Sequence, residues 1–318
     1  MSNKTKMWLI IAFSLILIGC ILLTGVMFKL KWDFSKLSTI KYETNNYGVN
    51  ENYENISINT NTANVVLVHS DDSKSSVVCY EETKMKHSVT VKNNTLYIEV
   101  VDTRKWYEYI GINFGSPKIT VSLPQGKYGN LSIKTDTGDV EIPKDFKFSS
   151  IDVIESTGNV INYASVTESI KIKTSTGNIY TENISAETIS LSASTGKITV
   201  SKINCKGDLS IKLSTGKTIL KDIGCNNLTS IGNTGNITLE NVNASEKFLI
   251  IRSTGDVSFK DCDAAEIFVE TDTGNVKGNF LSDKVYITET DTGRIDVPKT
   301  TSGGKCEIKT STGNIKIK

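Results

Sequence analysis

The stretch Ile-Lys-Ile-Lys-Thr-Ser-Thr-Gly-Asn-Ile, at residues 170–179, contains the pattern that decides the fold. Ile170 and Ile172 alternate with lysines, and a Thr-Gly pair separates them from Ile179. The Thr-Gly pair occurs ten times at intervals of 19 or 20 residues, with its glycines at Gly138, Gly158, Gly177, Gly196, Gly216, Gly235, Gly255, Gly274, Gly293 and Gly313. A repeat of this regularity predicts a solenoid, in which each repeat forms one coil and packs on its neighbours.

Aligning the repeats on the glycine shows which side chains each coil buries. Seven residues before the glycine, every copy has an apolar or semi-apolar residue: Leu131, Ile151, Ile170, Ile189, Leu209, Leu228, Phe248, Ile267, Tyr286 and Cys306. Five residues before the glycine, eight of the ten copies have an aliphatic residue, and the exceptions are Ser230 and Thr288. Two residues after the glycine, all ten copies have a β-branched residue, which is Thr218 in one of them. Offsets that differ by two are typical of strands. We therefore predict an all-β fold, a parallel β-solenoid (β-helix-like) of about ten coils of 19–20 residues at 128–318.

A degenerate coil precedes the tandem array. In Ile-Ser-Ile-Asn-Thr-Asn-Thr-Ala-Asn-Val, at residues 56–65, Ala63 takes the place of the glycine and the other offsets match. The apolar runs 89–91 and 96–100 flank Lys-Asn-Asn-Thr, which is the pattern of a hairpin. We predict a β cap region at residues 53–127 and a linker at residues 31–52. The strand at 315–318 is expected to end the stack, where its two lysines would discourage edge pairing.

The N-terminal segment predicts a membrane anchor. Residues 7–28 carry no charge and are mostly Leu, Ile, Val and Phe, which is enough for a transmembrane helix within residues 1–30. Lys4 and Lys6 favour a cytoplasmic start, so the C-terminal part is expected outside the cytoplasm at the cell membrane. An alternative is a lipoprotein, since Leu-Ile-Gly-Cys ending at Cys20 resembles a lipobox, although the apolar run continues beyond it.

Charge and cysteine content exclude several classes of protein. The chain has 36 basic and 35 acidic residues, and this balance removes the electrostatic argument for nucleic-acid binding. Outside the anchor lie five widely spaced cysteines, which form neither a disulfide framework nor a metal motif and are expected as small buried side chains. Cys205 and Cys225 occupy equivalent places in adjacent coils, so a disulfide between them stays open as an alternative.

The residues resemble a known family. Asn-Val-Val-Leu at 64–67, Lys-Ile-Thr-Val-Ser-Leu-Pro at 118–124 and the serial Thr-Gly-Asn-Ile coils are similar to the bacterial β-strand-repeat "putative adhesin" domain of unknown function, over residues 53–318. This resemblance implies a cell-envelope location and adhesion or envelope-stress accessory work. It implies no catalytic residues.

The sequence offers little for catalysis, and we predict no catalytic, cofactor-binding or metal-binding residues. Asp272 and Asp291 occupy equivalent positions of consecutive repeats and are expected about 5 Å apart, as a paired-acid or calcium site would require. Serine and asparagine replace them in other repeats, which favours a solvated turn. Five repeats contain Thr-x-Thr before the glycine, but parity in four of them places both threonines on the core side, against an ice-binding face.

One segment favours binding. Trp106, Tyr107, Tyr109 and Phe114 concentrate aromatic side chains in a polar loop, and exposed aromatics often anchor partners. The alternative is a cap packed over the first coil. We predict a non-enzymatic adhesin-like or scaffold protein that binds an envelope component or a surface glycan or protein. A β-helix enzyme acting on cell-wall polysaccharide and an accessory of envelope-stress signalling remain alternatives.

Overall fold

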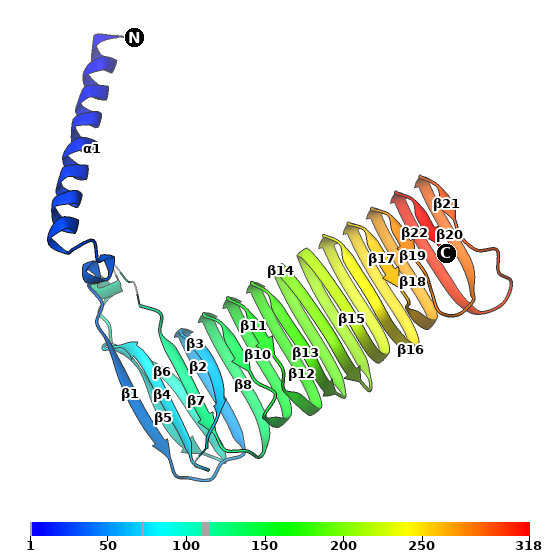
Figure 1. Ribbon diagram of the computed structural model, residues 1–318, viewed down its shortest axis with the longest axis horizontal. Coiled ribbons are helices and arrows are strands. Elements are labelled where there is room, and N and C mark those ends of the chain that lie inside the picture. The colour runs from blue at the N-terminus through cyan, green and yellow to red at the C-terminus, as the bar shows by residue number, and fades with distance from the viewer. Residues whose placement is uncertain (1, 72, 110–112, 114) are drawn as a thin grey trace. The chain divides into compact units, whose positions relative to one another are not determined.

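The computed structural model describes residues 2–71, 73–109, 113 and 115–318 (Figure 1). The chain forms two compact units, which are described separately. The first comprises Met1–Glu43, Glu82–Met85 and Asp102–Gly115, and the second comprises Thr44–Glu81, Lys86–Val101 and Ser116–Lys318.

The first unit contains α1, Asn3–Lys29, where the apolar run predicted a helix. The Ser2 hydroxyl accepts a hydrogen bond from the Thr5 backbone N–H at 3.2 Å, which satisfies one of the free donors at the helix start. The helix is long and apolar enough to cross a membrane, and its apolar window is not buried against the rest of the described chain. Two short 3₁₀ helices, η1 (Phe34–Leu37) and η2 (Trp106–Tyr109), belong to the same unit.

The second unit is built from strands. Apart from end residues of β1, β4, β5 and β6 that belong to the first unit, its N-terminal part contains β1 (Tyr42–Val49), β2 (Asn55–Thr62), β3 (Asn64–His69), β4 (Ser75–Glu82), β5 (Met85–Lys92), β6 (Thr95–Asp102) and β7 (Lys118–Leu123). The coils that follow contain β8 (Lys127–Thr137), β9 (Val140–Ile142), β10 (Lys147–Thr157), β11 (Val160–Asn162), β12 (Ser165–Thr176), β13 (Ile179–Ala186), β14 (Thr188–Cys205), β15 (Asp208–Thr234) and β16 (Ile237–Thr254). The C-terminal coils contain β17 (Val257–Lys260), β18 (Asp263–Thr273), β19 (Val276–Gly278), β20 (Lys284–Thr292), β21 (Ile295–Asp296), β22 (Gly304–Thr312) and β23 (Ile315–Ile317).

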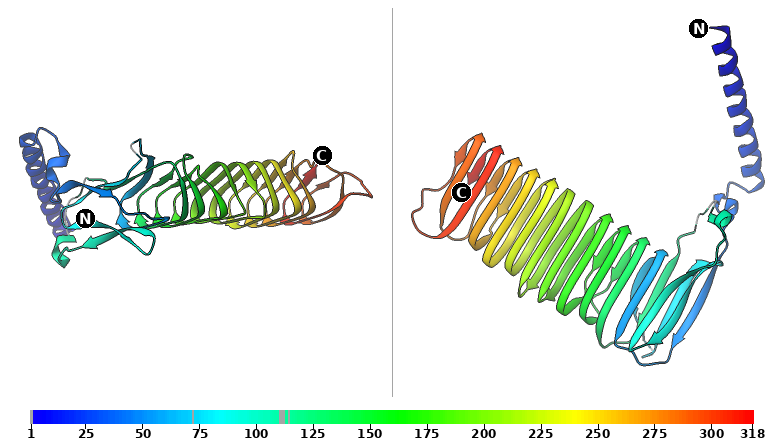
Figure 2. Two further views of the ribbon diagram at one scale, coloured as in Figure 1. Left: turned by 90° about the horizontal axis from the view of Figure 1, so that it is seen from below. Right: turned by 180° about the vertical axis from the view of Figure 1, so that it is seen from behind.

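The predicted parallel β-solenoid is confirmed. Equivalent residues of adjacent coils pair in register, as Ile151 does with Leu131 on one side and with Ile170 on the other. The same holds after the turn, where Val160 pairs with Val140 and with Ile179. These columns are buried and run through one continuous apolar core. Figure 2 shows the stacked coils that carry them. Each coil therefore contributes a layer of apolar side chains that its neighbours cover.

The glycine column is required by the close approach of the turns. Gly177 has φ of +151°, and a Cβ added there would lie 1.6 Å from the carbonyl oxygen of Gly158 in the preceding coil. Only a residue without a side chain fits such a contact. Beside it, Asn178 and Asn159 form a ladder, because the Asn159 Oδ1 atom accepts from the Asn178 backbone N–H at 3.0 Å.

The degenerate coil stacks where its pattern predicted. Ile56 pairs with Leu131 and Val65 pairs with Val140, although 75 residues separate the members of each pair. On its other side β2 pairs with β6 and β3 pairs with β7, and β4 adds antiparallel to β7. β5 and β6 flank a two-residue turn at Asn93 and Asn94, both with positive φ as a hairpin turn requires. Within residues 31–52, expected as a linker, the alternating sequence of β1 buries Val49 in the core and pairs with β4.

The C-terminal coil is inserted rather than terminal, so the expectation for residues 315–318 was wrong. β22 pairs in parallel with β18 on one side and with β20 on the other, and β23 lies likewise between β19 and β21. In Figure 1 the red β22 accordingly separates the orange β20 from β18. The coil at 284–296 is therefore the end of the stack. Its departures from the repeat, including Tyr286 and Thr288 in the apolar columns, suit a capping coil that is covered on one side only.

The threonines before the glycines divide between the core and the solvent. The first of each pair is buried in four coils, at Thr135, Thr174, Thr271 and Thr310, and the second is exposed. The expectation that both face the core was wrong for the second threonine, because the pairing skips one residue where each strand enters its turn. The Thr271 and Thr310 hydroxyls donate to the carbonyl oxygens of Gly255 and Gly274, at 3.1 and 3.0 Å, so they tie adjacent turns together.

Candidate functional site

The predicted aromatic segment lies in the first unit, on and beside η2. Trp106, Tyr107 and Tyr109 are exposed by 79%, 49% and 58% of their surface, and the rings of Trp106 and Tyr107 meet edge to face at 5.9 Å. Phe114, the fourth predicted residue, lies outside the described residues. The structure thus brings three of the predicted side chains together on one 3₁₀ turn, exposed rather than packed inside a cap.

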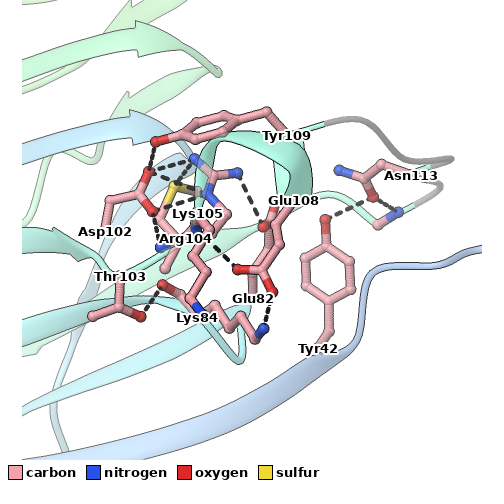
Figure 3. Close-up of polar contacts among 12 residues, drawn as sticks. Tyr42, Glu82, Lys84, Asp102, Thr103, Arg104, Lys105, Glu108, Tyr109 and Asn113 are labelled. Atoms are coloured by element: carbon pink, nitrogen blue, oxygen red, sulfur yellow. Dashed lines mark hydrogen bonds and ion pairs between the residues drawn. The ribbon is translucent and has the colours of Figure 1, made fainter.

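A partly buried arginine, Arg104, holds this turn in place (Figure 3). The Arg104 guanidinium donates to both oxygens of Asp102, at 2.6–3.1 Å, and to Glu82 Oε2 at 3.2 Å. It also lies 4.4 Å from the centre of the Tyr109 ring, a cation–π contact, while the Tyr109 hydroxyl donates to Asp102 at 3.1 Å. The hydrogen bond from Arg104 lowers the pKa of the Asp102 carboxyl to about 2. The network is therefore charged at neutral pH, and it orients Tyr109.

A second set of contacts fixes the other side of η2. Glu108 forms an ion pair with Lys84 and accepts from the Lys105 backbone N–H at 2.9 Å. The Lys84 hydrogen bond lowers the pKa of Glu108. Between η2 and residues 39–41 lies a groove of about 470 Å³, lined by Thr39, Ile40, Lys41, Glu82, Thr83, Lys84, Arg104, Tyr107 and Glu108. Its lining mixes charged, hydroxyl and aromatic groups, which suits a polar headgroup or sugar better than an apolar ligand.

A larger groove, which the sequence did not predict, crosses several coils of the solenoid. It has a volume of about 830 Å³ and is lined by Asn204, Cys205, Lys206, Gly224, Cys225, Asn226, Asn243, Ala244, Ser245, Asp263, Ala264, Ala265, Ser282, Lys284 and Gly304. Its floor is formed by small side chains, and its rim repeats amide, hydroxyl and carboxylate groups from coil to coil. The sequence signal for this floor is a column of small residues nine positions after five consecutive repeat glycines, at Ala186, Cys205, Cys225, Ala244 and Ala264.

The cysteines at this floor are free. Cys205 and Cys225 are both buried and unpaired, so the disulfide alternative is not realised. The Cys205 thiol lies 3.4 Å from the carbonyl oxygens of Glu187 and Asp208. Burial raises the pKa of the Cys225 thiol to about 12, which keeps it protonated and unreactive. Cys79, Cys262 and Cys306 are likewise buried, as their interpretation as small core residues predicted.

The predicted carboxylate pair does not form. Thr310 pairs with Thr271 on one side and with Thr290 on the other, so Ser311 of the inserted coil lies between Asp272 and Asp291. The two aspartates are exposed, and they line a small hollow of about 190 Å³. The expectation that they stack about 5 Å apart was wrong, because the inserted coil doubles their separation to roughly 10 Å. A site that requires adjacent carboxylates is therefore lost.

A buried polar cluster in the second unit was also missed. Atoms of Cys79, Glu81 and His87 lie within 4.8 Å of one another. The Glu81 carboxylate accepts from the His87 backbone N–H and faces His87 Nδ1, each at 2.6 Å, and accepts from Asn45 Nδ2 at 2.7 Å. His87 Nε2 lies 2.8 Å from the Thr60 hydroxyl. Burial, and then the Glu81 charge, raises the pKa of the Cys79 thiol to about 12. Glu81, His87, Asn45 and Thr60 thus form one hydrogen-bonded network beside the buried Cys79 thiol.

Coils in register, turns closed by glycine and polar outer faces define a repeat protein of the β-solenoid class. The sequence pattern of the Toastrack DUF4097 family matches residues 53–216 and 197–318, and the chain belongs to this family. The resemblance deduced from the sequence is thereby confirmed, and the match begins at residue 53, where the resemblance was predicted to begin.

Several solved structures are similar to the chain. A "putative adhesin" from Bacteroides fragilis is 17% identical, with a TM-score of 0.38, over 87% of this chain and 97% of that one. One from Parabacteroides merdae is 9% identical, with a TM-score of 0.44, over 87% and 96%. A "putative lipid binding protein" from Parabacteroides distasonis is 12% identical, with a TM-score of 0.35, over 88% and 98%. No curated protein matches the sequence. These identities and scores transfer no ligand to this chain.

Proposed function

We propose that the chain is a membrane-anchored extracytoplasmic β-solenoid that binds or scaffolds envelope components and is not an enzyme. Membership of the Toastrack DUF4097 family and an exposed apolar helix of 27 residues support this proposal. Lys4 and Lys6 before the helix favour a cytoplasmic N-terminus and a solenoid outside the cytoplasm. Lipidation of Cys20 would serve as an alternative anchor with the same location.

The observation that carries the binding proposal is the groove at residues 204–304. Its rim repeats hydrogen-bonding groups at the spacing of the coils, about 4.8 Å, while its floor is formed mostly by small side chains, with the buried Lys284 also in the lining. An extended chain rich in hydroxyl and amide groups, such as a surface glycan or an extended protein segment, suits such a surface. The enzyme alternative has lost its paired acids, since Ser311 separates Asp272 from Asp291.

Two exposed glycines allow the groove to be blocked without disturbing the fold. A Cβ added at Gly224, in the groove, would meet nothing within 4 Å, and the same holds for Gly48, which lies outside it. We expect the purified full chain in nanodiscs to capture an envelope glycan or protein fraction. Gly224→Gln should weaken that capture at least tenfold, while Gly48→Gln should leave it unchanged. Capture of no fraction by the wild-type chain would contradict the binding function, and equal binding by both variants would exclude the groove.

A further inference from the structure

The end of α1 is followed by exposed aromatic side chains in the same compact unit. Trp32 and Phe34 come three and five residues after Lys29 and are exposed by 58% and 51%. Within this unit η2 adds Trp106, Tyr107 and Tyr109. We name Trp32, Phe34, Trp106, Tyr107 and Tyr109 the aromatic platform. So many large exposed rings are unusual on a monomer surface that faces only water.

Hydrogen bonds hold η2 close to the residues that follow the helix. The Thr83 backbone N–H donates to the Lys41 carbonyl oxygen at 3.0 Å. The Tyr42 hydroxyl donates to Asn113 Oδ1 at 2.7 Å, as Figure 3 shows. Only residues 30–38 separate α1 from residues 39–42, so η2 lies within the reach of this short connection from the point where the helix ends.

The chemistry of the platform fits a phospholipid surface. Tryptophan and tyrosine combine an apolar body with a polar tip, and they concentrate where a membrane meets water. Lys29 ends the helix and Lys31, Lys36 and Lys41 follow it, against Asp33 and Glu43, so this stretch carries a positive excess that favours phosphate headgroups. The Arg104 network fixes η2 from behind while its rings stay exposed.

We propose that the aromatic platform lies in the headgroup layer of the membrane that α1 enters, so that η2 makes a second, non-spanning membrane contact. This inference rests on the proposed membrane anchoring. It assigns the predicted aromatic residues to lipid rather than to a glycan or a protein partner. Two contacts formed by one compact unit restrict the tilt of that unit on the membrane more than a helix alone would.

The three tryptophans provide a direct test, because one lies in the helix, one follows it and one is in η2, at Trp8, Trp32 and Trp106. Three full-length variants would each keep one tryptophan and carry phenylalanine at the other two positions. They are placed in nanodiscs whose lipids carry bromine either near the headgroup or near the middle of the acyl chain. Bromine quenches tryptophan emission on contact, so the loss of emission reports depth.

We expect headgroup-proximal bromine to quench Trp106 as strongly as Trp32, and mid-chain bromine to quench Trp106 much less. Quenching of Trp8 and Trp32 without quenching of Trp106 overturns the inference and leaves the anchor intact. Absence of quenching at all three positions overturns the anchor and the inference together. Protection of Trp106 by added envelope glycan, with no effect of brominated lipid, assigns the platform to a glycan and also overturns the inference.

Discussion

The Lys284 ammonium lies 2.6 Å from the Asp263 carboxylate, although the coils that carry these residues are not neighbours. The C-terminal coil passes between them, and Gly304 of that coil pairs with Lys284. A Cβ at Gly304 would meet the Ala265 carbonyl oxygen at 2.3 Å and Lys284 Nζ at 3.3 Å. The absence of a side chain at Gly304 therefore lets the lysine reach across. Its ammonium also donates to the Ala264 carbonyl oxygen at 2.7 Å.

Removing Asp263 should loosen the end of the stack. The Lys284 side chain is 2% exposed, so Asp263→Ala leaves a buried cation with only neutral partners, at a cost of roughly 2–4 kcal/mol. We expect faster amide hydrogen exchange in residues 284–318 and a lower urea midpoint. The matched control is Glu240→Ala, which removes the exposed pair with Lys260 at 2.8 Å and should cost about 0–1 kcal/mol. Equal losses in the two variants would show that the Lys284 bridge does not hold the end coils.

The glycine column offers a second test, of the stacking itself. Gly177→Ala combines a left-handed backbone with a clash against the Gly158 carbonyl oxygen, and we expect a loss of about 2 kcal/mol or more. Gly224→Ala, in a coil of the same array but with open space around its Cβ, should change stability by less than about 1 kcal/mol. Chemical denaturation followed by circular dichroism measures both. Similar values for the two variants would contradict the close approach of the turns.

The sequence predicted the regular part of the fold and missed what depends on exceptions to the repeat. Because apolar residues recur at fixed offsets, residues 128–278 have one arrangement of coils that keeps every apolar column continuous. The degenerate repeat around Ala63 follows the same offsets, so the sequence also predicted a coil that is distant in the chain. The insertion of the C-terminal coil was missed, because every coil satisfies the same pattern and order along the chain is not order in space. The large groove was missed for a related reason, since small side chains at a corner carry no chemical motif.

Two exceptions in the apolar columns are explained by a third residue. Ser230 and Thr218 interrupt columns that are aliphatic in the neighbouring coils. Both face the buried Arg252 guanidinium, which lies 2.8 Å from the Ser230 hydroxyl and 3.4 Å from that of Thr218. Gly232 makes room for it, since a Cβ there would lie 2.7 Å from Arg252 Nη1. Burial lowers the pKa of Arg252 to about 10. The exceptions thus form one polar network. Its members stand in different columns of the repeat alignment, so no single column reveals it.

This network should be replaceable by apolar side chains. Arg252→Met alone leaves the buried Ser230 and Thr218 hydroxyls without their partner and should cost about 1–3 kcal/mol. The triple variant Arg252→Met, Ser230→Ile, Thr218→Val restores the aliphatic columns and should be at least as stable as the wild-type chain. Urea unfolding of the single and triple variants measures this difference. A triple variant weaker than the single variant would show that the network, and not the apolar columns, stabilises these coils.

Glu155 should make the stability of the solenoid depend on pH. It occupies the column of buried threonines, paired with Thr135 and Thr174, and neither of its buried carboxylate oxygens has a hydrogen-bond partner among the described residues. Burial, and then the charge of Asp139, raises its pKa to about 7. The folded chain therefore holds this proton more tightly than the unfolded chain, whose glutamate has a pKa near 4.3.

The sign of the effect follows from that difference. Below about pH 4 the glutamate is protonated in both states, so its ionisation contributes nothing to the free energy of unfolding. As the pH rises to about 7 only the unfolded chain ionises, so stability is lost on the order of 1–3 kcal/mol. Glu155→Gln keeps a neutral side chain at every pH. The variant should match the wild-type chain at pH 4 and exceed it in unfolding free energy at pH 8. Glu141→Gln, exposed in the preceding coil, should keep the wild-type slope. Two results would contradict this prediction: a free energy of unfolding of the wild-type chain that stays level from pH 4 to pH 8, or a Glu155→Gln variant that is no more stable than the wild-type chain at pH 8. Either result would indicate that Glu155 is ionised in the folded chain and has polar partners there.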